Sequence, residues 1–348
     1  MDLKIEEIFK EAVEIGASDV HLVVGHFPVL RIEGDLKVIK KWPMVSKENL
    51  EKLLENITTP GQRKQFLKNK ETDFSYNLGK LARVRISLFQ ERGNSCLSAR
   101  IISSRVPTME EIRMPPIAYE LARMDRGLVI VTGPAGCGKS TSLAAMINLI
   151  NQEKAYRIIT LEDPIEFIIP SIKSIIVQRE LGSDMNSFHQ ALKYIVRQDP
   201  NVIMVGEMRD LETITSAITL AETGQLVLTT LHTPDVVQSI NRIIDVFPSS
   251  QQTQIRVQLS ISLRGIIAQR LLPKVSGGRL ASWEVLVNTS AVTNLIRENK
   301  IAQLRTVIQT GAEEGMFTMD QDIKRLWKEG LISKEVAMAH MIRPQDLI

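Results

Sequence analysis

The feature that constrains this chain most is a glycine-rich loop that joins a strand-like run to a helix-like run. The apolar run LVIVT is followed directly by GPAGCGKS, from Gly133 to Ser140. These eight residues match the phosphate-loop pattern GxxxxGK[ST], and the helical pattern TSLAAMINLI comes next. Because strand, loop and helix occur in the required order, the sequence predicts a parallel α/β fold that binds a nucleotide.

The residue types in this loop predict how the nucleotide is held. Glycines let backbone N–H groups turn towards phosphates, and the helix that follows adds its positive N-terminal end. Lys139 is expected to neutralise the β- and γ-phosphates, and the Ser140 hydroxyl is expected to be a ligand of Mg²⁺. The predicted ligands are therefore ATP and Mg²⁺, bound by Gly133, Pro134, Ala135, Gly136, Cys137, Gly138, Lys139, Ser140 and Thr141.

Carboxylates follow two further apolar runs. VIMV is followed by Gly206 and Glu207, where many phosphate-loop enzymes have an Asp before the Glu to hold the metal. With glycine there, Glu207 is expected to orient or deprotonate the attacking water. Glu162 and Asp163, after RIITL, are then expected to assist the metal. The alternative for this pair is a capped turn without a catalytic role.

One histidine also follows an apolar run. His232 comes directly after LVLTTL, at an expected strand end from which it could sense the γ-phosphate. A single histidine is more often an ordinary polar residue. The catalytic interpretation of His232 therefore depends on the motifs around it.

The chain divides into four parts by its patterns. Residues 1–102 predict a small α/β domain, and residues 103–116, with three prolines and no steady period, predict a linker. In residues 117–289 short apolar runs alternate with helical segments, as a parallel sheet covered on both faces requires. Residues 290–348 are expected to be mostly helical.

Local signals within the first part predict individual elements. Two apolar runs on either side of Glu33-Gly34-Asp35 predict a hairpin, and Ser46 is a plausible N-cap for a helix over residues 47–57. Further along, the alternation in RVRI places Arg83 and Arg85 together on one face of a sheet.

Composition argues against several classes of protein. The 43 basic and 40 acidic residues leave a formal charge of only +3, and aromatic residues make up 5%, which disfavours a nucleic-acid-dependent ATPase. The chain has neither a signal peptide nor an apolar run long enough to span a membrane. Cys96 and Cys137 fit no metal-ligand spacing and are expected to be reduced thiols. We therefore expect a cytoplasmic protein without direct membrane insertion.

The motifs together resemble those of the type II/IV secretion ATPase superfamily, most closely its type IV pilus retraction branch of the PilT and PilU type. The resemblance rests on segments that occur in the same order along most of the chain. They are GASDVHL (16–22), GPAGCGKSTSLA, RIITLEDPIEF (157–167), RQDPNVIMVGEMRD (197–210), TGQLVLTTLHT (223–233) and AVTNLIRE (291–298).

This resemblance implies an N-terminal PAS-like domain joined to a RecA-like ATPase domain, assembled as a homohexamer. It also implies that arginines of the first domain reach the phosphates; Arg85 and Arg100 are similar in position to those arginines. Ordinary surface ion pairs are the alternative for both. The implied partners are an inner-membrane pilus platform protein, which would bring the chain to the inner face of that membrane, and a paralogous pilus ATPase.

Three residues depart from the family pattern. Gln225 replaces the first histidine of the histidine box, which puts a role needing an imidazolium in doubt. Thr293 stands where the retraction motif usually has a basic residue. Cys137 lies in the phosphate loop, where a helix N-terminus could lower the pKa of its thiol and make it sensitive to oxidation.

The sequence therefore predicts a hexameric ATP-hydrolysing motor for type IV pilus retraction and twitching motility. Gln225 keeps open an accessory retraction ATPase that works with a stronger paralogue. A pilus-extension or type II secretion ATPase is a further alternative, but such proteins usually carry a four-cysteine zinc element that this chain lacks.

Overall fold

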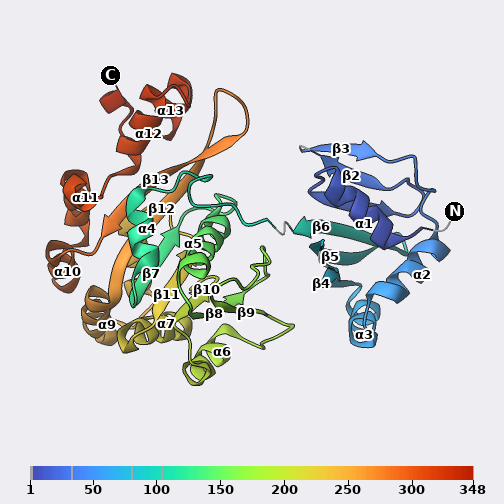
Figure 1. Cartoon of the computed structure of the whole chain (residues 1–348), viewed down its shortest axis with the longest axis horizontal. Helices are drawn as coiled ribbons and strands as arrows, with labels where there is room; N and C mark the ends of the chain where they lie inside the picture. Colours follow the sequence, from blue (N-terminus) through green and yellow to red (C-terminus); the bar gives the residue numbers. More distant parts are fainter. Residues whose placement is uncertain (1–2, 33, 80, 103–104, 348) are drawn as a thin grey trace. The chain divides into compact units, whose positions relative to one another are not determined.

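The computed structural model describes residues 3–32, 34–79, 81–102 and 105–347. Its chain forms two compact units, one of Met1–Arg105 with Glu166–Ile168 and one of Val106–Ile165 with Ile169–Ile348. Each unit combines helices with a sheet, which confirms the α/β class (Figure 1). None of the helices in the described ranges is both long and apolar enough to cross a membrane.

The first unit is a six-stranded antiparallel sheet with helices packed on its apolar face. The strand order is β3-β2-β1-β6-β5-β4. The core joins apolar residues of the first two helices to strand residues such as Val84 and Ile86, both fully buried. The strands are β1 (Asp19–Val23), β2 (Val29–Ile32), β3 (Asp35–Val38), β4 (Glu71–Leu78), β5 (Ala82–Glu91) and β6 (Asn94–Ile102), and the helices are α1 (Ile5–Glu14), α2 (Lys47–Ile57) and α3 (Pro60–Asn69).

Most local predictions for this unit are confirmed. The Ser46 hydroxyl accepts a hydrogen bond from the Asn49 amide at 3.1 Å and caps α2. β2 and β3 form the expected hairpin, although Glu33 in its turn lies outside the described residues. Helix α3 was not predicted from the sequence. It begins with a capping box between Thr59 and Gln62, a signal that could have revealed it.

The second unit contains a seven-stranded sheet in the order β13-β12-β7-β11-β10-β8-β9. All neighbouring pairs are parallel except β12 and β13. Consecutive burial of Leu128 to Val131 reflects cover on both faces, as the apolar runs predicted. The strands are β7 (Gly127–Thr132), β8 (Arg157–Glu162), β9 (Ile175–Glu180), β10 (Val202–Val205), β11 (Leu226–Leu231), β12 (Leu263–Pro273) and β13 (Arg279–Val287).

Helices of the second unit share one core with its sheet. The C-terminal helices contribute residues such as Ile296, Leu304 and Ile323 to the cluster that also contains Leu128 and Ile130. The helices are α4 (Pro116–Arg123), α5 (Lys139–Glu153), α6 (Phe188–Ile195), α7 (Leu211–Thr223), α8 (Val236–Asp245), α9 (Ser249–Ser262), α10 (Ser290–Arg297), α11 (Leu304–Thr310), α12 (Met319–Lys328) and α13 (Lys334–His340), with 3-10 turns at Val196–Gln198, Ile301–Gln303, Ala312–Glu314 and Pro344–Leu347.

The segment expected to link the domains begins at residues 103 and 104, which lie outside the described residues. From Val106 to Ile165 the chain belongs to the second unit. Met109 and Met114 are buried there, and α4 starts at Pro116. The three prolines of this segment therefore accompany a packed irregular stretch.

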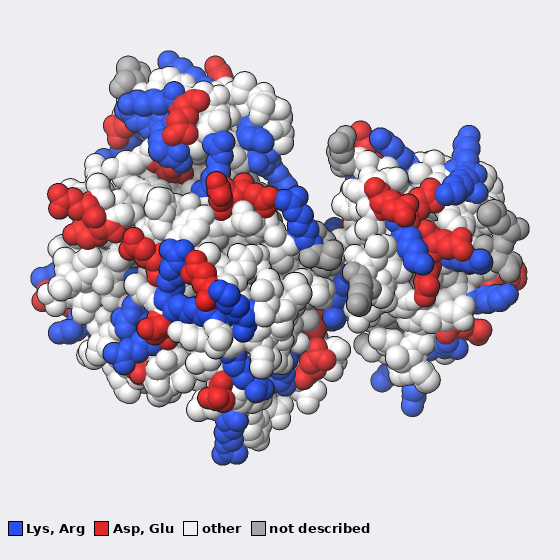
Figure 2. Space-filling view, viewed as in Figure 1, with Lys and Arg blue, Asp and Glu red and all other residues white. Residues whose placement is uncertain are grey.

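Basic and acidic side chains are interspersed on the face shown in Figure 2. This distribution agrees with the small net charge of +3. Mixed charge of this kind gives no extended basic path on that face for a nucleic-acid backbone.

Candidate functional site

The phosphate loop leaves the C-terminal end of β7 and turns into α5. Gly133 has a φ of 149° and Gly138 a φ of 93°, in the region that favours glycine. A Cβ on Gly133 would lie 2.3 Å from the carbonyl oxygen of Gln269 and 2.7 Å from the Cys137 sulfur. Packing and backbone conformation therefore both demand glycine at this position.

The start of α5 has the character of an anion site. Its N-cap is Gly138, which has no side chain to occupy the first N–H groups. The hydroxyls of Ser140 and Thr141 make no hydrogen bond to any residue that the structure describes. The hydroxyls of Ser140 and Thr141, the N-terminal end of α5 and the Lys139 ammonium fit the phosphates of a nucleotide with its Mg²⁺. No cluster of three or more acidic, histidine or cysteine side chains in the described ranges is arranged to hold a metal by itself.

Parallel pairing brings the other predicted site residues to the same edge of the sheet. Strands β7, β11, β10 and β8 are consecutive neighbours in register, so their C-terminal ends lie side by side. The residues that follow or end these strands are those expected from the sequence: the loop from Gly133, His232, Gly206 with Glu207, and Glu162 with Asp163.

A continuous row of polar contacts runs along this edge. Lys139 Nζ lies 2.9 Å from the carbonyl oxygen of Gly133 and 3.5 Å from Nδ1 of His232. On the other side of the ring, Nε2 of His232 lies 3.1 Å from Oε2 of Glu207. Arg209 forms an ion pair with the second oxygen of Glu207, and this hydrogen bond raises the pKa of Arg209. The phosphate-loop lysine and the candidate base are thus connected through one imidazole.

The contacts of His232 indicate which of its nitrogens carries the proton. An ammonium can only donate, so Nδ1 must accept if it bonds to Lys139. A carboxylate can only accept, so Nε2 must donate to Glu207. A neutral imidazole with its proton on Nε2 satisfies both neighbours. The ring can therefore orient Glu207 without being charged.

Glu162 and Asp163 lie in different environments. Glu162 is buried, and its Oε1 accepts hydrogen bonds from Thr160 at 2.6 Å and Gln178 at 3.0 Å. Asp163 is exposed and close enough to Arg209 to raise that residue's pKa electrostatically. Of the two carboxylates, Glu162 is the one whose orientation is fixed by hydrogen bonds.

The glycine before Glu207 has a packing reason. A Cβ on Gly206 would lie 3.1 Å from the carbonyl oxygen of Leu161 and 3.5 Å from the Cα of Glu162. The Gly206 amide donates to that same Leu161 oxygen at 2.8 Å. A side chain at this position would be crowded by β8. Close packing between β10 and β8 therefore explains why glycine stands where many phosphate-loop enzymes have Asp.

Gln225 lies at the opposite edge of the sheet from the phosphate loop. It immediately precedes β11, whereas His232 immediately follows it. The six residues of β11 separate the two by about 20 Å at the rise of an extended strand. Gln225 accepts a hydrogen bond from the Thr223 hydroxyl at 2.9 Å, within its own turn. The doubt that this substitution raised about the histidine box does not extend to the site at His232.

Thr293 is an anchoring residue in the structure. Its hydroxyl lies 3.3 Å from the carbonyl oxygen of Ser260 and 3.2 Å from the side-chain oxygen of Asn288. It therefore fastens α10 to the end of α9.

The lowered pKa expected for Cys137 is not found. Burial raises the pKa of this thiol, although Lys139 and nearby backbone amides act in the other direction. Only 3% of the residue is exposed, and its sulfur packs against Gly133. The helix N-terminus was visible in the sequence, whereas the burial that outweighs it was not.

Gln269 on β12 is a site residue that sequence reasoning missed. Its Oε1 accepts a hydrogen bond from the Ser142 hydroxyl at 2.8 Å. Its backbone carbonyl oxygen packs so closely against Gly133 that no side chain would fit there. A pocket of about 570 Å³ lies beside it, a volume typical of small-molecule sites. Gly138 and Thr141 of the loop line the pocket together with residues 111–113 and parts of β12 and β13.

Arg85 and Arg100 belong to the first unit. They lie directly opposite each other on β5 and β6, so their side chains share one face of the sheet. Arg85 forms an ion pair with Asp73 at 3.4 Å, and Arg100 forms one with Asp19 at 2.9 Å. Burial raises the pKa of Asp19, but hydrogen bonds from Arg100 and Ser18 outweigh it and hold the pKa below its usual value.

Comparison with known proteins gives consistent matches over the whole chain. A family model described as type II/IV secretion system protein matches residues 2–277. The chain is 44% identical over 344 residues to the type IV pilus retraction ATPase PilT of Pseudomonas aeruginosa, covering 99% of this chain and 100% of that protein. It is 39% identical over 346 residues to the type IV pilus ATPase PilU of the same organism, covering 99% and 90%.

A solved structure agrees with these sequence matches. The crystal structure of the pilus retraction motor PilT with bound ADP superimposes with a TM-score of 0.93 at 45% identity, covering 99% of both chains. Both compact units of the present chain therefore have counterparts in that motor.

Proposed function

This chain belongs to the type II/IV secretion system ATPase family, and we propose that it is an ATP-hydrolysing motor of type IV pilus retraction. The observation that carries the proposal is the row of contacts from Lys139 through His232 to Glu207 beside the phosphate loop. It supports hydrolysis as well as binding, because a candidate base is held at the edge where the terminal phosphate of ATP would lie.

In this proposal the phosphate loop binds the nucleotide, and residues at the strand ends activate the attacking water. Loop amides and Lys139 bind the β- and γ-phosphates, and the Ser140 hydroxyl would hold Mg²⁺. The metal would neutralise charge on the phosphates. Glu207, oriented by His232 and Arg209, accepts a proton from the attacking water. Glu162 and Asp163 would help to hold that metal.

The pocket beside Gln269 is suited to the nucleoside part of ATP. It opens next to Gly138 and Thr141, so a nucleotide with its phosphates in the loop has space for its base there. Its walls come from β12, β13 and residues 111–113, all in the second unit. A movement of residues 111–113 on nucleotide binding would then reach the segment that leads to the first unit.

Arg85 and Arg100 are proposed to stabilise the negative charge of the phosphates during hydrolysis. Like charges directly opposite each other on neighbouring strands are unfavourable, so their pairing is costly unless an anion lies between them. The present partner of Arg85, Asp73, forms an exposed pair that contributes little stability, whereas Arg100 pairs with the mostly buried carboxylate of Asp19. In a hexamer such arginines can be supplied to the site of the same or a neighbouring copy.

The finer assignments belong to the same proposal. The chain works as a homohexamer in the cytoplasm, at the inner face of the inner membrane, where it acts on a pilus platform protein. A paralogous ATPase is a further candidate partner. Identity to PilT along the entire chain supports a retraction motor, and the location of Gln225 away from His232 supports a main over an accessory role.

The test is the phenotype of a strain without this gene, complemented either by the wild type or by Lys139→Ala. Excess surface pili without twitching, rescued only by the wild type, is the expected result. Bald cells would indicate extension and overturn the proposal. The ATPase rate of the purified ring distinguishes a main motor from an accessory one, because the accessory alternative predicts a rate near background.

A further inference from the structure

A buried carboxylate on β13 accepts hydrogen bonds from the first residues of two helices. Oε1 of Glu284 accepts a hydrogen bond from the Val236 amide at 2.9 Å, and Oε2 accepts one from the Met319 amide at 3.3 Å. Val236 is the first residue of α8, and Met319 is the first residue of α12. One side chain therefore holds the starts of both helices.

This position is unusual for a glutamate. Glu284 is only 5% exposed, and no ion pair with it is found among the described residues. Burial raises its pKa, and the two backbone amides act against that rise. The positive ends of α8 and α12 provide the favourable field that a charged group needs in such a place. A hydrophobic residue would fill the same volume but would leave two buried amides without acceptors.

One of the two helices leads directly to the candidate catalytic edge. α8 starts four residues after His232, and Thr233 between them is tied to β7. The Thr132 hydroxyl donates to the carbonyl oxygen of Thr233 at 2.7 Å, and the Thr233 hydroxyl lies 2.6 Å from that of Ser239 on α8. The start of α8 is therefore connected through Thr233 to Thr132, the last residue before the phosphate loop.

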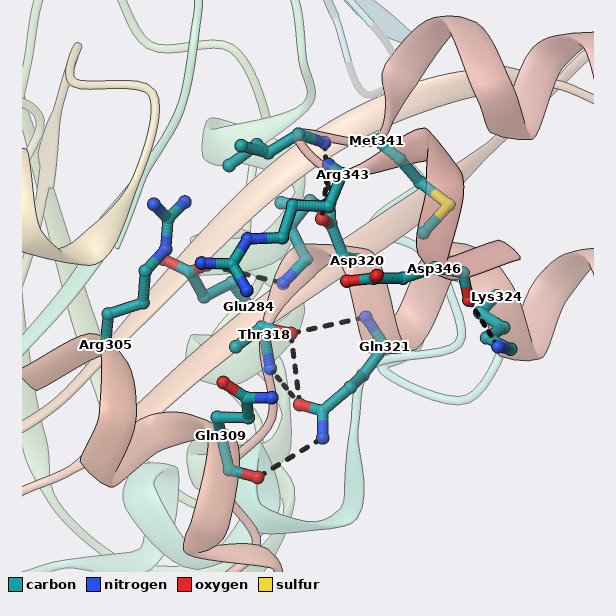
Figure 3. A pocket seen from close by; sticks show the side chains of 12 residues that line it. Glu284, Arg305, Gln309, Thr318, Asp320, Gln321, Lys324, Met341, Arg343 and Asp346 are labelled. Atoms are coloured by element: carbon teal, nitrogen blue, oxygen red, sulfur yellow. Dashed lines mark hydrogen bonds between the residues drawn. The ribbon is translucent and has the colours of Figure 1, made fainter. Parts of the chain in front are cut away.

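The strand register places Glu284 in the same row of the sheet as Thr132, the last residue before the phosphate loop. Thr132 on β7 pairs with Ala268 on β12, which in turn pairs with Glu284 on β13. The row reaches across the sheet from the base of the phosphate loop to the C-terminal helices. Figure 3 shows Glu284 between Arg305 of α11 and Thr318, the N-cap of α12, beside an open pocket of about 320 Å³.

We propose that Glu284 is a positioning residue that couples the C-terminal helices to the histidine at the ATPase edge. A displacement of α12 moves the acceptor of the Val236 amide, and with it the turn that carries His232. The C-terminal helices can therefore alter turnover without contacting the nucleotide. This inference rests on the proposed ATPase function for its kinetic consequence, but its structural part can be tested separately.

The chain offers a matched control for a mutation of Glu284. Asp322 on α12 is a second buried carboxylate, 3% exposed, that accepts a hydrogen bond from the Trp283 amide at 2.8 Å. It fastens the same helix to the same strand, and the hydrogen bonds that it forms go to Trp283 and Arg325, not to α8. Glu284→Gln removes one of the two acceptor oxygens at nearly constant volume. Asp322→Asn does the same at the control site and also removes the ion pair between Asp322 and Arg325.

The first measurement is amide hydrogen exchange on the full-length hexamer. Glu284→Gln is expected to speed exchange at Val236 and over residues 233–240, and Asp322→Asn is expected to leave this segment unchanged. This readout does not depend on catalysis. Unchanged protection of Val236 in Glu284→Gln, or equal loss in both variants, would overturn the coupling.

The second measurement separates positioning from stability. We expect Glu284→Gln to lower kcat roughly 10- to 100-fold while the Kd for ATP stays within about twofold, as misplacement of a catalytic group predicts. Asp322→Asn is expected to change the melting temperature similarly but to keep kcat. Equal kcat losses in the two variants would refute the inference. If the wild-type ring shows no turnover, the proposed function is refuted. The hydrogen-exchange measurement then still tests whether Glu284 couples α12 to α8.

Discussion

Nε2 of His232 lies 3.1 Å from Oε2 of Glu207, while the other ring nitrogen faces Lys139 at 3.5 Å. The imidazole therefore contacts the candidate base and the phosphate-loop lysine at the same time. A shift of Lys139 towards a phosphate would weaken its contact with Nδ1 and leave the contact with Glu207 in place. The predictions below follow from this arrangement and from the burial of its neighbours.

Glu207→Gln is expected to retain ATP binding and to lose turnover. The amide keeps the size of the side chain but cannot accept a proton, and general bases contribute roughly 10²- to 10⁴-fold to rate. ATP affinity and steady-state turnover of the purified ring provide the measurement. Lys139→Ala is the control that should lose binding itself. Appreciable turnover by Glu207→Gln would remove Glu207 from its proposed role.

His232→Gln tests the orienting contact. Gln can reach one neighbour at a time, whereas the ring bridges Lys139 and Glu207 across its two nitrogens. We expect kcat to fall roughly tenfold or more, the effect of a misplaced base, with little change in ATP affinity. Wild-type kcat in this variant would show that His232 is an ordinary polar residue.

Gln225→His restores the family residue at the far edge of the sheet. Because Gln225 lies at the start of β11 and the site lies at its end, we expect kcat to stay within about twofold of the wild type. Turnover of Gln225→His and of His232→Gln, measured in the same assay, compares the two ends of β11. A large gain in turnover would mean that the two edges communicate.

Cys137 is expected to resist oxidation. Its pKa is raised by burial, so little of the reactive thiolate forms near neutral pH. Mild peroxide should leave ATP turnover unchanged, and Cys137→Ala should respond in the same way as the wild type. Rapid inactivation of the wild type alone would show that the thiol becomes accessible.

Asp19 is expected to contribute stability that disappears in acid. Its pKa in the folded chain lies below the reference value of 3.8, so its contribution is complete above that value and is lost as the pH falls through the lower folded pKa. Thermal unfolding from pH 6 to pH 2 should show Asp19→Asn less stable than the wild type at pH 6, with the difference closing in acid. A difference that is constant with pH would exclude the linkage to Arg100.

Much of the site could be predicted because its residues are adjacent to strong local signals. Glu207, His232 and Glu162 each follow or end an apolar run, and parallel strands bring such ends together at one edge. Gln269 and Glu284 could not be found in this way. Both lie within long strands, and their partners are 127 and 48 residues distant in sequence.

The sequence by itself determined the α/β class, the phosphate loop and the set of residues at the strand ends, because glycine spacing and apolar runs are local properties of the chain. Only the tertiary structure decided that Gln225 lies away from the site, that Cys137 is buried, and that Glu284 joins α8 to α12. Burial and long-range hydrogen bonding depend on which segments pack together, and that is a property of the folded sheet.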